Sequence, residues 1–353
     1  MKYILLLPFA AVALFAQSPC DSSGSGPVPF HDHGKSGYIS PKGIVIPAQF
    51  DFAAPFIPDG AIACLSERCG LLSENGSFIG QTWSRKSRPL PENYSEGLAP
   101  AVEGDLWGYL DRSRNVIIPF RYKYAGPFHQ GMARVRLGDK FFFIDRKGNR
   151  VTPQFDGVFD FSEDLAAVTV GKKVGYVRRD GSFALLPIHE GASGIDFSEG
   201  LVAVRVKGKV GFMDKAGNIV IQPKYDDAYP FSDGRAPVEL KAKWGYIDKK
   251  GSVIVAIQYD IGHMFSEGLA SVETDGKWGY IDREGHFSIP LGFDSAMPFC
   301  GGVAAVETFQ RIGETNKAWG TELYKGKHGV IDHGGNYVWR DAEDQTWPSP
   351  FCF

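Results

Sequence analysis

The chain has 353 residues, of which 43% are hydrophobic and 22% are charged, and its formal net charge is −3. This balance is typical of a globular chain and excludes the intrinsically disordered class. A pI near 6.3 gives no electrostatic basis for binding nucleic acid or an anionic membrane surface.

The N-terminal residues predict export. Met1 and Lys2 supply a positive start, residues 4–15 form an apolar run, and Ala16 is a plausible cleavage site. We therefore expect a signal peptide over 1–16 and a periplasmic or extracellular protein. The run is too short for a membrane-spanning helix, and no later segment approaches that length, so no transmembrane segment is expected in the mature chain. Lipidation of Cys20 is the less favoured alternative, because Pro19 precedes it.

Residues 17–33 are predicted to form a flexible leader. His31, Asp32 and His33 at its end could supply one face of a metal site. Chance clustering in a leader is the simpler interpretation, so neither a metal nor any other cofactor is predicted.

One block then recurs about every 34 residues, over an array that we place at 34–336. Its clearest copies begin at Trp107, Trp244 and Trp278, and each has the form Trp-Gly-Tyr-(Ile or Leu)-Asp. Weaker copies begin at Ser36, Cys69, Phe141, Val174, Val210 and His328. A second aromatic series has a similar spacing and comprises Phe56, Tyr94, Phe128, Phe161, Phe197, Phe231, Phe265 and Phe299. A period of this length indicates a repeat architecture, here with eight near-complete units and a partial one.

Each repeat is expected to give about three short antiparallel strands. Runs of β-forming residues lie between turn signals such as Asp275-Gly276, a favoured hairpin turn, and Pro290 is expected to end a strand. The recurrent Asp is interpreted as a turn residue, because it precedes a glycine by three positions. The recurrent Trp, Gly and Phe are interpreted as packing residues, namely Trp107, Gly108, Trp244, Gly245, Trp278, Gly279, Phe231, Phe265 and Phe299.

The pattern resembles the WG (KWG) repeat family of bacterial proteins. The residues that carry the resemblance are those from Lys243 to Asp248, those from Phe265 to Ala270 and those from Lys277 to Asp282. The resemblance extends over most of the mature chain and implies an exported β-repeat protein. It implies no catalytic residues.

The repeat pattern is interrupted by an insertion at about 310–327. A mixture of aromatic and polar residues there suits a binding loop, and the candidates are Arg311, Glu314, Asn316, Lys317, Trp319 and Tyr324. An additional solvated hairpin without a partner is an equal alternative. Residues 337–353 are expected to cap the last repeat.

The five cysteines allow two disulfides in an exported protein. Cys64 and Cys69 flank a predicted hairpin turn, and Cys300 is a candidate partner for Cys352. Cys20 is then left over.

We expect an all-β, open, curved, solenoid-like array, since 34 residues is short for a four-stranded propeller blade of about 40. A closed propeller-like ring is the alternative. No catalytic motif is present, so the favoured function is a non-enzymatic scaffold that binds a protein or a cell-envelope ligand. The alternatives are an envelope glycan hydrolase that uses repeat carboxylates such as Glu199 and Glu267, and a structural envelope spacer.

Overall fold

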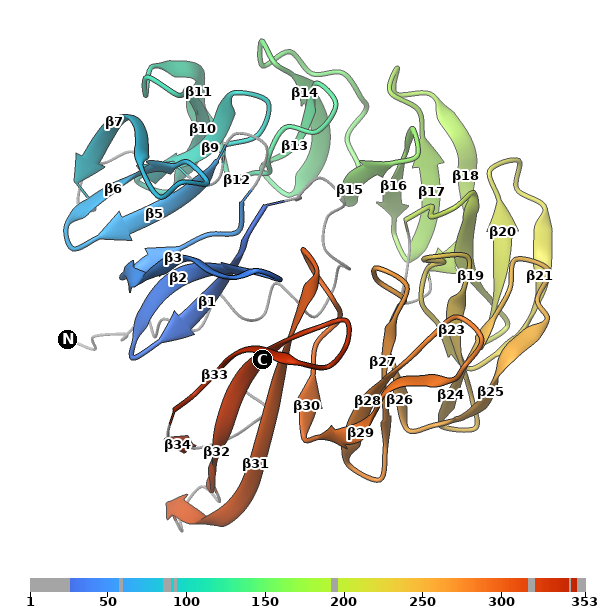
Figure 1. Cartoon of the computed structure of the whole chain (residues 1–353). Helices are drawn as coiled ribbons and strands as arrows, with labels where there is room; N and C mark the ends of the chain where they lie inside the picture. The colour runs from blue at the N-terminus through green and yellow to red at the C-terminus, as the bar shows by residue number, and fades with distance from the viewer. Residues whose placement is uncertain are drawn as a thin grey trace.

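A computed structural model describes residues 26–56, 60–84, 90–91, 94–191, 196–316, 321–342 and 344–347. These residues form small antiparallel sheets, and the sheets are arranged as nine blades around a closed ring (Figure 1). The fold is therefore a nine-bladed β-propeller over the described part of the chain. Within it, no helix is long and apolar enough to cross a membrane.

Three or four strands make each blade, and the chain enters the blades in sequence. Blade 1 contains β1 (Val28–Asp32), β2 (Lys35–Ser40) and β3 (Gly43–Phe50). Blade 2 contains β4 (Phe52–Ala53), β5 (Ala61–Leu65), β6 (Arg68–Leu72) and β7 (Phe78–Ser84). Blade 3 contains β8 (Leu90–Pro91), β9 (Leu98–Glu103), β10 (Leu106–Asp111) and β11 (Val116–Tyr122). Blade 4 contains β12 (Tyr124–Ala125), β13 (Met132–Leu137) and β14 (Lys140–Asp145). Blade 5 contains β15 (Gly157–Ser162), β16 (Leu165–Val170), β17 (Lys173–Val177) and β18 (Phe183–Gly191). Blade 6 contains β19 (Leu201–Val206), β20 (Lys209–Asp214) and β21 (Ile219–Tyr225). Blades 5 and 6 share one sheet, because β18 pairs with β19.

Blades 7 to 9 each consist of a two-residue first strand and three longer strands. Blade 7 contains β22 (Asp227–Ala228), β23 (Ala236–Leu240), β24 (Lys243–Ile247) and β25 (Val253–Tyr259). Blade 8 contains β26 (Ile261–Gly262), β27 (Ala270–Thr274), β28 (Lys277–Ile281) and β29 (Phe287–Phe293). Blade 9 contains β30 (Ser295–Ala296), β31 (Val303–Asn316), β32 (Thr321–Asp332) and β33 (Tyr337–Arg340). A further strand, β34 (Gln345–Trp347), pairs with β32.

The expectation of an open array was wrong, because the first and last blades pack against each other. Phe30 of β1 and Trp339 of β33 lie with ring centroids 5.5 Å apart. Phe30 and Ile39 form one buried cluster with Val303 and Val330 of blade 9. The predicted cap therefore starts with a strand that pairs inside blade 9 and packs on blade 1, and β1 itself lies within the segment expected to be a leader.

Four strands fit into 34 residues because the first strand of a blade is very short. β26 has two residues, and a single residue, Asp260, separates it from the end of β25. No inter-blade loop is therefore needed, and the estimate of three strands per repeat missed this strand.

Aromatic side chains fill the space between successive blades. Tyr246 is fully buried and meets Phe265 of the next blade edge to face, with the ring centroids 5.0 Å apart. Its hydroxyl donates a 2.8 Å hydrogen bond to the backbone carbonyl of His263, also in the next blade. The same hydroxyl bond occurs at Tyr38, Tyr109 and Tyr280. The tyrosine of the repeated block thus joins neighbouring blades by both an apolar contact and a polar one.

The Trp-Gly pair packs within a blade. The indole of Trp244 stacks on Tyr229, which directly follows the first strand, with the ring centroids 5.1 Å apart. Trp278 stacks in the same way on His263, at 4.8 Å. A Cβ atom added to Gly279 would lie 2.7 Å from the carbonyl oxygen of Ile289, on the neighbouring strand. The close neighbour of Gly279 is therefore backbone, at a bulge in the pairing of β28 with β29.

The recurrent aspartates occupy the tight turn that follows the strand with the repeated Trp-Gly block. The Asp145 carboxylate accepts hydrogen bonds from the backbone N–H groups of Lys147 and Asn149, each 2.9 Å long, and Gly148 adopts a φ of 82°. Equivalent bonds occur at Asp214, Asp248, Asp282 and Asp332. The hydrogen bonds to Asn149 and Lys147 hold the pKa of the Asp145 carboxyl below its usual value despite the opposing effect of desolvation.

Candidate functional site

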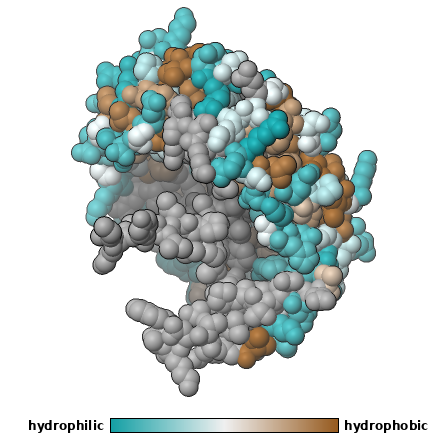
Figure 2. Space-filling view, turned by 90° about the vertical axis from the view of Figure 1, so that its left-hand side faces the viewer, coloured by the Kyte–Doolittle hydropathy of each residue, from teal (hydrophilic) through white to brown (hydrophobic). Residues whose placement is uncertain are grey.

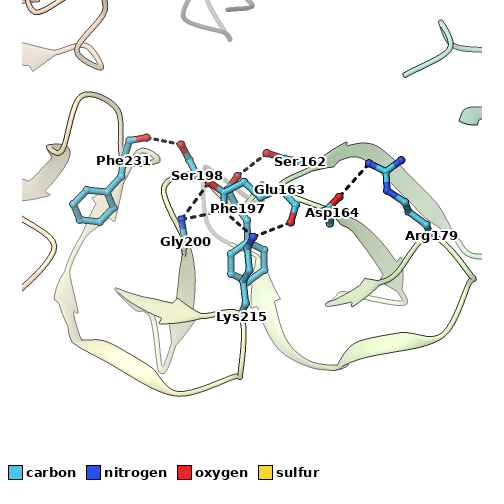
Figure 3. A network of polar contacts seen from close by, with 9 residues as sticks. All are labelled: Ser162, Glu163, Asp164, Arg179, Phe197, Ser198, Gly200, Lys215 and Phe231. Atoms are coloured by element: carbon cyan, nitrogen blue, oxygen red, sulfur yellow. Dashed lines mark hydrogen bonds and ion pairs between the residues drawn. The ribbon is translucent and has the colours of Figure 1, made fainter. Parts of the chain in front are cut away.

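A Ser-Glu pair follows the recurrent aromatic residue at Tyr94, Phe161, Phe197 and Phe265, and it connects one blade to the next. The Ser198 hydroxyl donates a 2.6 Å hydrogen bond to the carbonyl of Phe231 in the following blade (Figure 3). The Glu199 carboxylate accepts a 3.0 Å hydrogen bond from the backbone N–H of Gly234 and lies 2.9 Å from the Lys249 ammonium. Each pair therefore forms a clamp between blades.

The two carboxylates considered for glycan hydrolysis both belong to such clamps. Glu267 accepts hydrogen bonds from the backbone N–H of Gly302 and lies 3.2 Å from the His333 ring, as Glu199 does with Gly234 and Lys249. A retaining or inverting glycosidase needs two carboxyl groups about 5 to 10 Å apart across a substrate. Glu199 and Glu267 are instead each bound to the blade that follows them.

A second recurring ion pair lies at the junctions between blades. The Lys243 ammonium contacts the Asp260 carboxylate, and the other Asp260 oxygen accepts a 3.1 Å bond from the N–H of Asp275. The hydrogen bond from Lys243 is the main reason that the pKa of Asp260 is lowered. The same pairing joins Lys35 to Asp51, Lys140 to Asp156, Lys209 to Asp226 and Lys277 to Asp294.

Blade 5 departs from the repeat in its charges. Gln130 takes the place of the clamp glutamate. The guanidinium of Arg179 donates to the backbone carbonyl of Gln130 at 2.9 Å, as Lys215 does to that of Glu163. It also donates to the Asp164 carboxylate, at 3.2 Å (Figure 3). Asp164 stands where most repeats have glycine, and it keeps the positive φ, 72°. These residues border an open cleft of about 610 Å³ that also includes Glu163, Leu165 and Lys215. Its charges compensate one another, so the cleft favours no particular class of ligand.

Exposed apolar side chains are distributed around the ring. The first two residues of several outer strands are exposed, such as Val116 and Ile117 in β11 and Val253 and Ile254 in β25. On the face drawn in Figure 2, apolar patches are separated by hydrophilic side chains. Leu186 and Ile188 of β18 are the most exposed of the large hydrophobic residues, at 64% and 61%. No single apolar patch on the described surface indicates a docking site.

The predicted insertion is an extension of one hairpin, which we call the arm. It consists of the parts of β31 and β32 between Thr308 and Lys327, together with β34 (Figure 1). In blade 8 the corresponding positions, Thr274 and Lys277, are joined by the tight turn Asp275-Gly276. The arm therefore adds sixteen residues to a hairpin that is otherwise two residues long at its tip.

The candidate binding residues all belong to the arm. Arg311 pairs in register with Tyr324 across the hairpin, while Glu314 and Asn316 lie further along β31. Lys317 and Trp319 fall outside the described residues, as do the side chains of the other four. The structure therefore places the backbone of the predicted loop but not its chemistry.

At the base of the arm lie three side chains that the sequence did not single out, which we call the root cluster: Glu307, His328 and Asp341. The Nδ1 atom of His328 lies 3.0 Å from an Asp341 carboxylate oxygen, and its Nε2 atom lies 3.4 Å from a Glu307 oxygen. Burial raises the pKa of Glu307 to about 7, with His328 opposing that shift and Asp294 adding to it.

The leader residues show no shared site. The His31 ring lies 2.9 Å from the Ser36 hydroxyl on the paired strand, while the side chain of His33 is 84% exposed. Among the described residues, no group of three or more His, Cys, Asp or Glu side chains could hold a metal ion.

One predicted disulfide is present. Cys64 and Cys69 are directly opposite in β5 and β6, and a disulfide joins them. Cys300 is also disulfide-bonded, but its predicted partner Cys352 lies outside the described residues, as does Cys20.

Comparison with known proteins gives one family. The model described as WG containing repeat matches residues 107–141, 141–173, 211–244, 244–278 and 278–308. The unmatched residues between 173 and 211 include the irregular part of blade 5. No curated protein sequence matches this chain.

Several solved structures are similar in fold. One described as a eukaryotic initiation factor has a TM-score of 0.58 at 9% identity, over 90% of this chain and 96% of that one. Kluyveromyces lactis Hsv2 has a TM-score of 0.39 at 10% identity, over 80% of this chain and 94% of that one. PorZ, a surface component of the type-IX secretion system of Porphyromonas gingivalis, has a TM-score of 0.33 at 12% identity, over 85% and 45%. At these identities only the first likeness informs the fold, and none informs the function.

Proposed function

We propose that this chain, which belongs to the WG-repeat family, is a non-enzymatic scaffold that binds a protein partner outside the cytoplasm. The observation that carries the proposal is the use of the repeated polar residues. The turn aspartates, the junction Lys–Asp pairs and the Ser-Glu clamps are bonded within or between blades. A repeat built in this way supplies a rigid frame, and specific binding then depends on what departs from the repeat.

The arm is the largest such departure and is the docking element in this proposal. Within the described residues, the 310–316 part of β31 pairs only with β32, whereas β32 is also paired with β34. One strand edge of the arm is thus available in the described structure. An exposed edge can accept a strand from another protein through backbone hydrogen bonds. The same exposed edge would risk aggregation in a protein without a partner.

Two features support an extracytoplasmic location. The apolar run at residues 4–15 has the composition of a signal peptide. The Cys64–Cys69 disulfide is the second, because disulfides persist mainly outside the reducing cytosol.

An envelope polysaccharide is the alternative ligand, and a structural spacer is the alternative role. No contact in the described structure favours a glycan hydrolase, because Glu199 and Glu267 serve as clamps.

The experiment compares the chain from Gln17 with a shortened variant. In that variant, residues 309–326 are replaced by Asp-Gly, so that Thr308 and Lys327 are joined as Thr274 and Lys277 are in blade 8. Both proteins serve as baits for affinity capture from the cell envelope and the medium, after circular dichroism has established equal folding. We expect a protein that the full chain retains and the shortened variant loses.

Equal recovery by both baits would place the binding site elsewhere on the ring. Recovery of a polysaccharide by both baits would support the alternative ligand. No specific recovery by the full chain would contradict the scaffold proposal.

A further inference from the structure

The root cluster keeps the glutamate of blade 8 but not the two aromatic residues that pair beside it. There, the Glu273 carboxylate accepts a hydrogen bond from the N–H of Gly276 in the tight turn. Trp278 lies opposite Glu273 on one side and opposite Phe293 on the other. In blade 9 the arm takes the place of that turn, so the corresponding Glu307 has no turn amide to bind. A histidine, His328, stands at the tryptophan position, and Asp341 bonds to its backbone.

The geometry of His328 requires an additional proton in the cluster. Both ring nitrogens face carboxylate oxygens, at 3.0 Å for Asp341 and 3.4 Å for Glu307. A neutral imidazole carries only one N–H group, so its other nitrogen would present a lone pair to a carboxylate. The observed arrangement is satisfied when the imidazole carries two protons, or when the Glu307 carboxyl carries one.

Burial makes the loss of that proton costly. Glu307 is only 8% exposed, and its second oxygen has no hydrogen-bond partner in the structure. A buried carboxylate without a compensating donor or cation is strongly unfavourable. The other charged groups around the cluster already have partners.

Those groups come from each neighbouring element. Asp294, at the start of blade 9, pairs with Lys277 of blade 8 and accepts a hydrogen bond from the N–H of Phe309. Arg340 of β33 donates a hydrogen bond to the Thr308 hydroxyl, and Lys327 of β32 donates one to the Ala342 carbonyl. None of these contacts supplies a donor to Glu307, so His328 is its nearest source of a proton in the described structure.

We propose that Glu307, His328 and Asp341 form a proton-controlled latch at the base of the arm. With one proton shared in the cluster, the imidazole links β31 to the segment after β33 and holds the arm against blade 9. When that proton is lost, two carboxylates face a neutral imidazole, and the base of the arm loosens. The inference concerns the arm that the proposed function assigns to binding, but it can be tested without any partner.

The closed latch binds the proton more tightly than the open one, and this difference sets the direction of the pH dependence. Because burial raises the pKa of Glu307 to about 7, the latch is complete in mildly acidic solution and is lost as the pH rises through about 7. For a single proton, the opening equilibrium changes by at most about tenfold per pH unit.

Hydrogen–deuterium exchange on the whole chain measures this opening. Exchange of peptides from β31 and β32 is compared at pH 6 and pH 8, after correction for the pH dependence of intrinsic exchange. We expect protection of the arm to fall by about threefold to tenfold over this range. Peptides from β19 and β20 in blade 6 should keep their protection and report that the ring stays folded.

Two variants locate the effect. Glu307→Gln removes the titrating carboxyl, and we expect arm protection that no longer changes between pH 6 and pH 8. Glu273→Gln changes the equivalent residue of blade 8 and should leave the pH dependence of the arm as it is in the unmodified chain. Unchanged arm protection in the unmodified chain at both pH values would overturn the proposal. So would a pH dependence that survives in Glu307→Gln or disappears in Glu273→Gln.

Discussion

Two buried tyrosines allow the polar contact between blades to be separated from the apolar one. Tyr246 donates a 2.8 Å hydrogen bond to the carbonyl of His263 in the next blade. The hydroxyl of Tyr225, which is only 1% exposed, has no partner. The substitution Tyr→Phe removes the hydroxyl at either position and leaves the ring in place.

The two substitutions should therefore have different effects. Tyr246→Phe leaves a buried carbonyl without its donor, and we expect a loss of about 1–3 kcal/mol in the free energy of unfolding. Tyr225→Phe removes a buried hydroxyl that is not bonded, so its effect should be neutral or stabilising by about 1 kcal/mol.

Urea unfolding followed by tryptophan fluorescence checks this prediction, because Trp244 and Trp278 lie in the two blades that the Tyr246 hydroxyl joins. The midpoints are compared at an unchanged m-value. Equal losses in both variants, or a larger loss in Tyr225→Phe, would refute the claim that the tyrosine hydroxyl joins the blades.

Three further predictions concern the repeat itself. Gly279→Ala should destabilise the fold by more than about 2 kcal/mol, since the new Cβ would lie 2.7 Å from the Ile289 carbonyl oxygen. Gly292→Ala is the control, because its Cβ would lie 4.0 Å from the nearest atom, the Pro290 carbonyl oxygen; equal shifts of the melting temperature would contradict the account. Ser198→Ala should cost about 1 kcal/mol by removing the 2.6 Å bond to Phe231, and a denaturation midpoint equal to that of the unmodified chain would argue against the clamp. Burial lowers the pKa of His263 to about 4, so the unfolded chain binds the proton more tightly than the folded one. The free energy of unfolding should therefore fall as the pH drops from about 6.5 to 4, by at most about 3 kcal/mol. Unfolding measured across this range should depend less on pH in His263→Gln, and an identical pH dependence would exclude a contribution from His263.

Much of the local structure follows from the sequence. The 34-residue period identifies the repeat and its family, and the spacing between Asp145 and Gly148 is that of the observed turn. The position of the insertion is also evident, because many more residues separate Thr308 from Lys327 than separate Thr274 from Lys277 along the sequence. These features are local, so short-range rules are sufficient to predict them.

Ring closure could not be predicted in the same way. It depends on two-residue strands such as β26, which are too short to give a pattern, and on the contact between Phe30 and Trp339, which lie at opposite ends of the array. The altered set of contacts that Arg179 makes with Gln130 and Asp164 was also not predictable, because it joins residues far apart in the sequence.

The root cluster had a signal in the sequence that was missed. His328 was recognised as a weak copy of the Trp position, but Asp341 follows it by thirteen residues, across a bulge between β32 and β33. Aligning blade 9 with blade 8 shows a histidine at the position of Trp278. It does not place Asp341 beside that histidine, because Asp341 aligns with Leu291 and faces His328 only through the different register of β32 and β33.

The closed ring is the central structural claim, and one distance tests it directly. Spin labels are introduced at the exposed positions Lys42 in blade 1 and Ala305 in blade 9, and their separation is measured by pulsed electron paramagnetic resonance. A closed ring predicts a separation below about 30 Å. Nine sheets stacked in an open array at about 10 Å each would place the labels about 80 Å apart, and a distance of that size would contradict the ring.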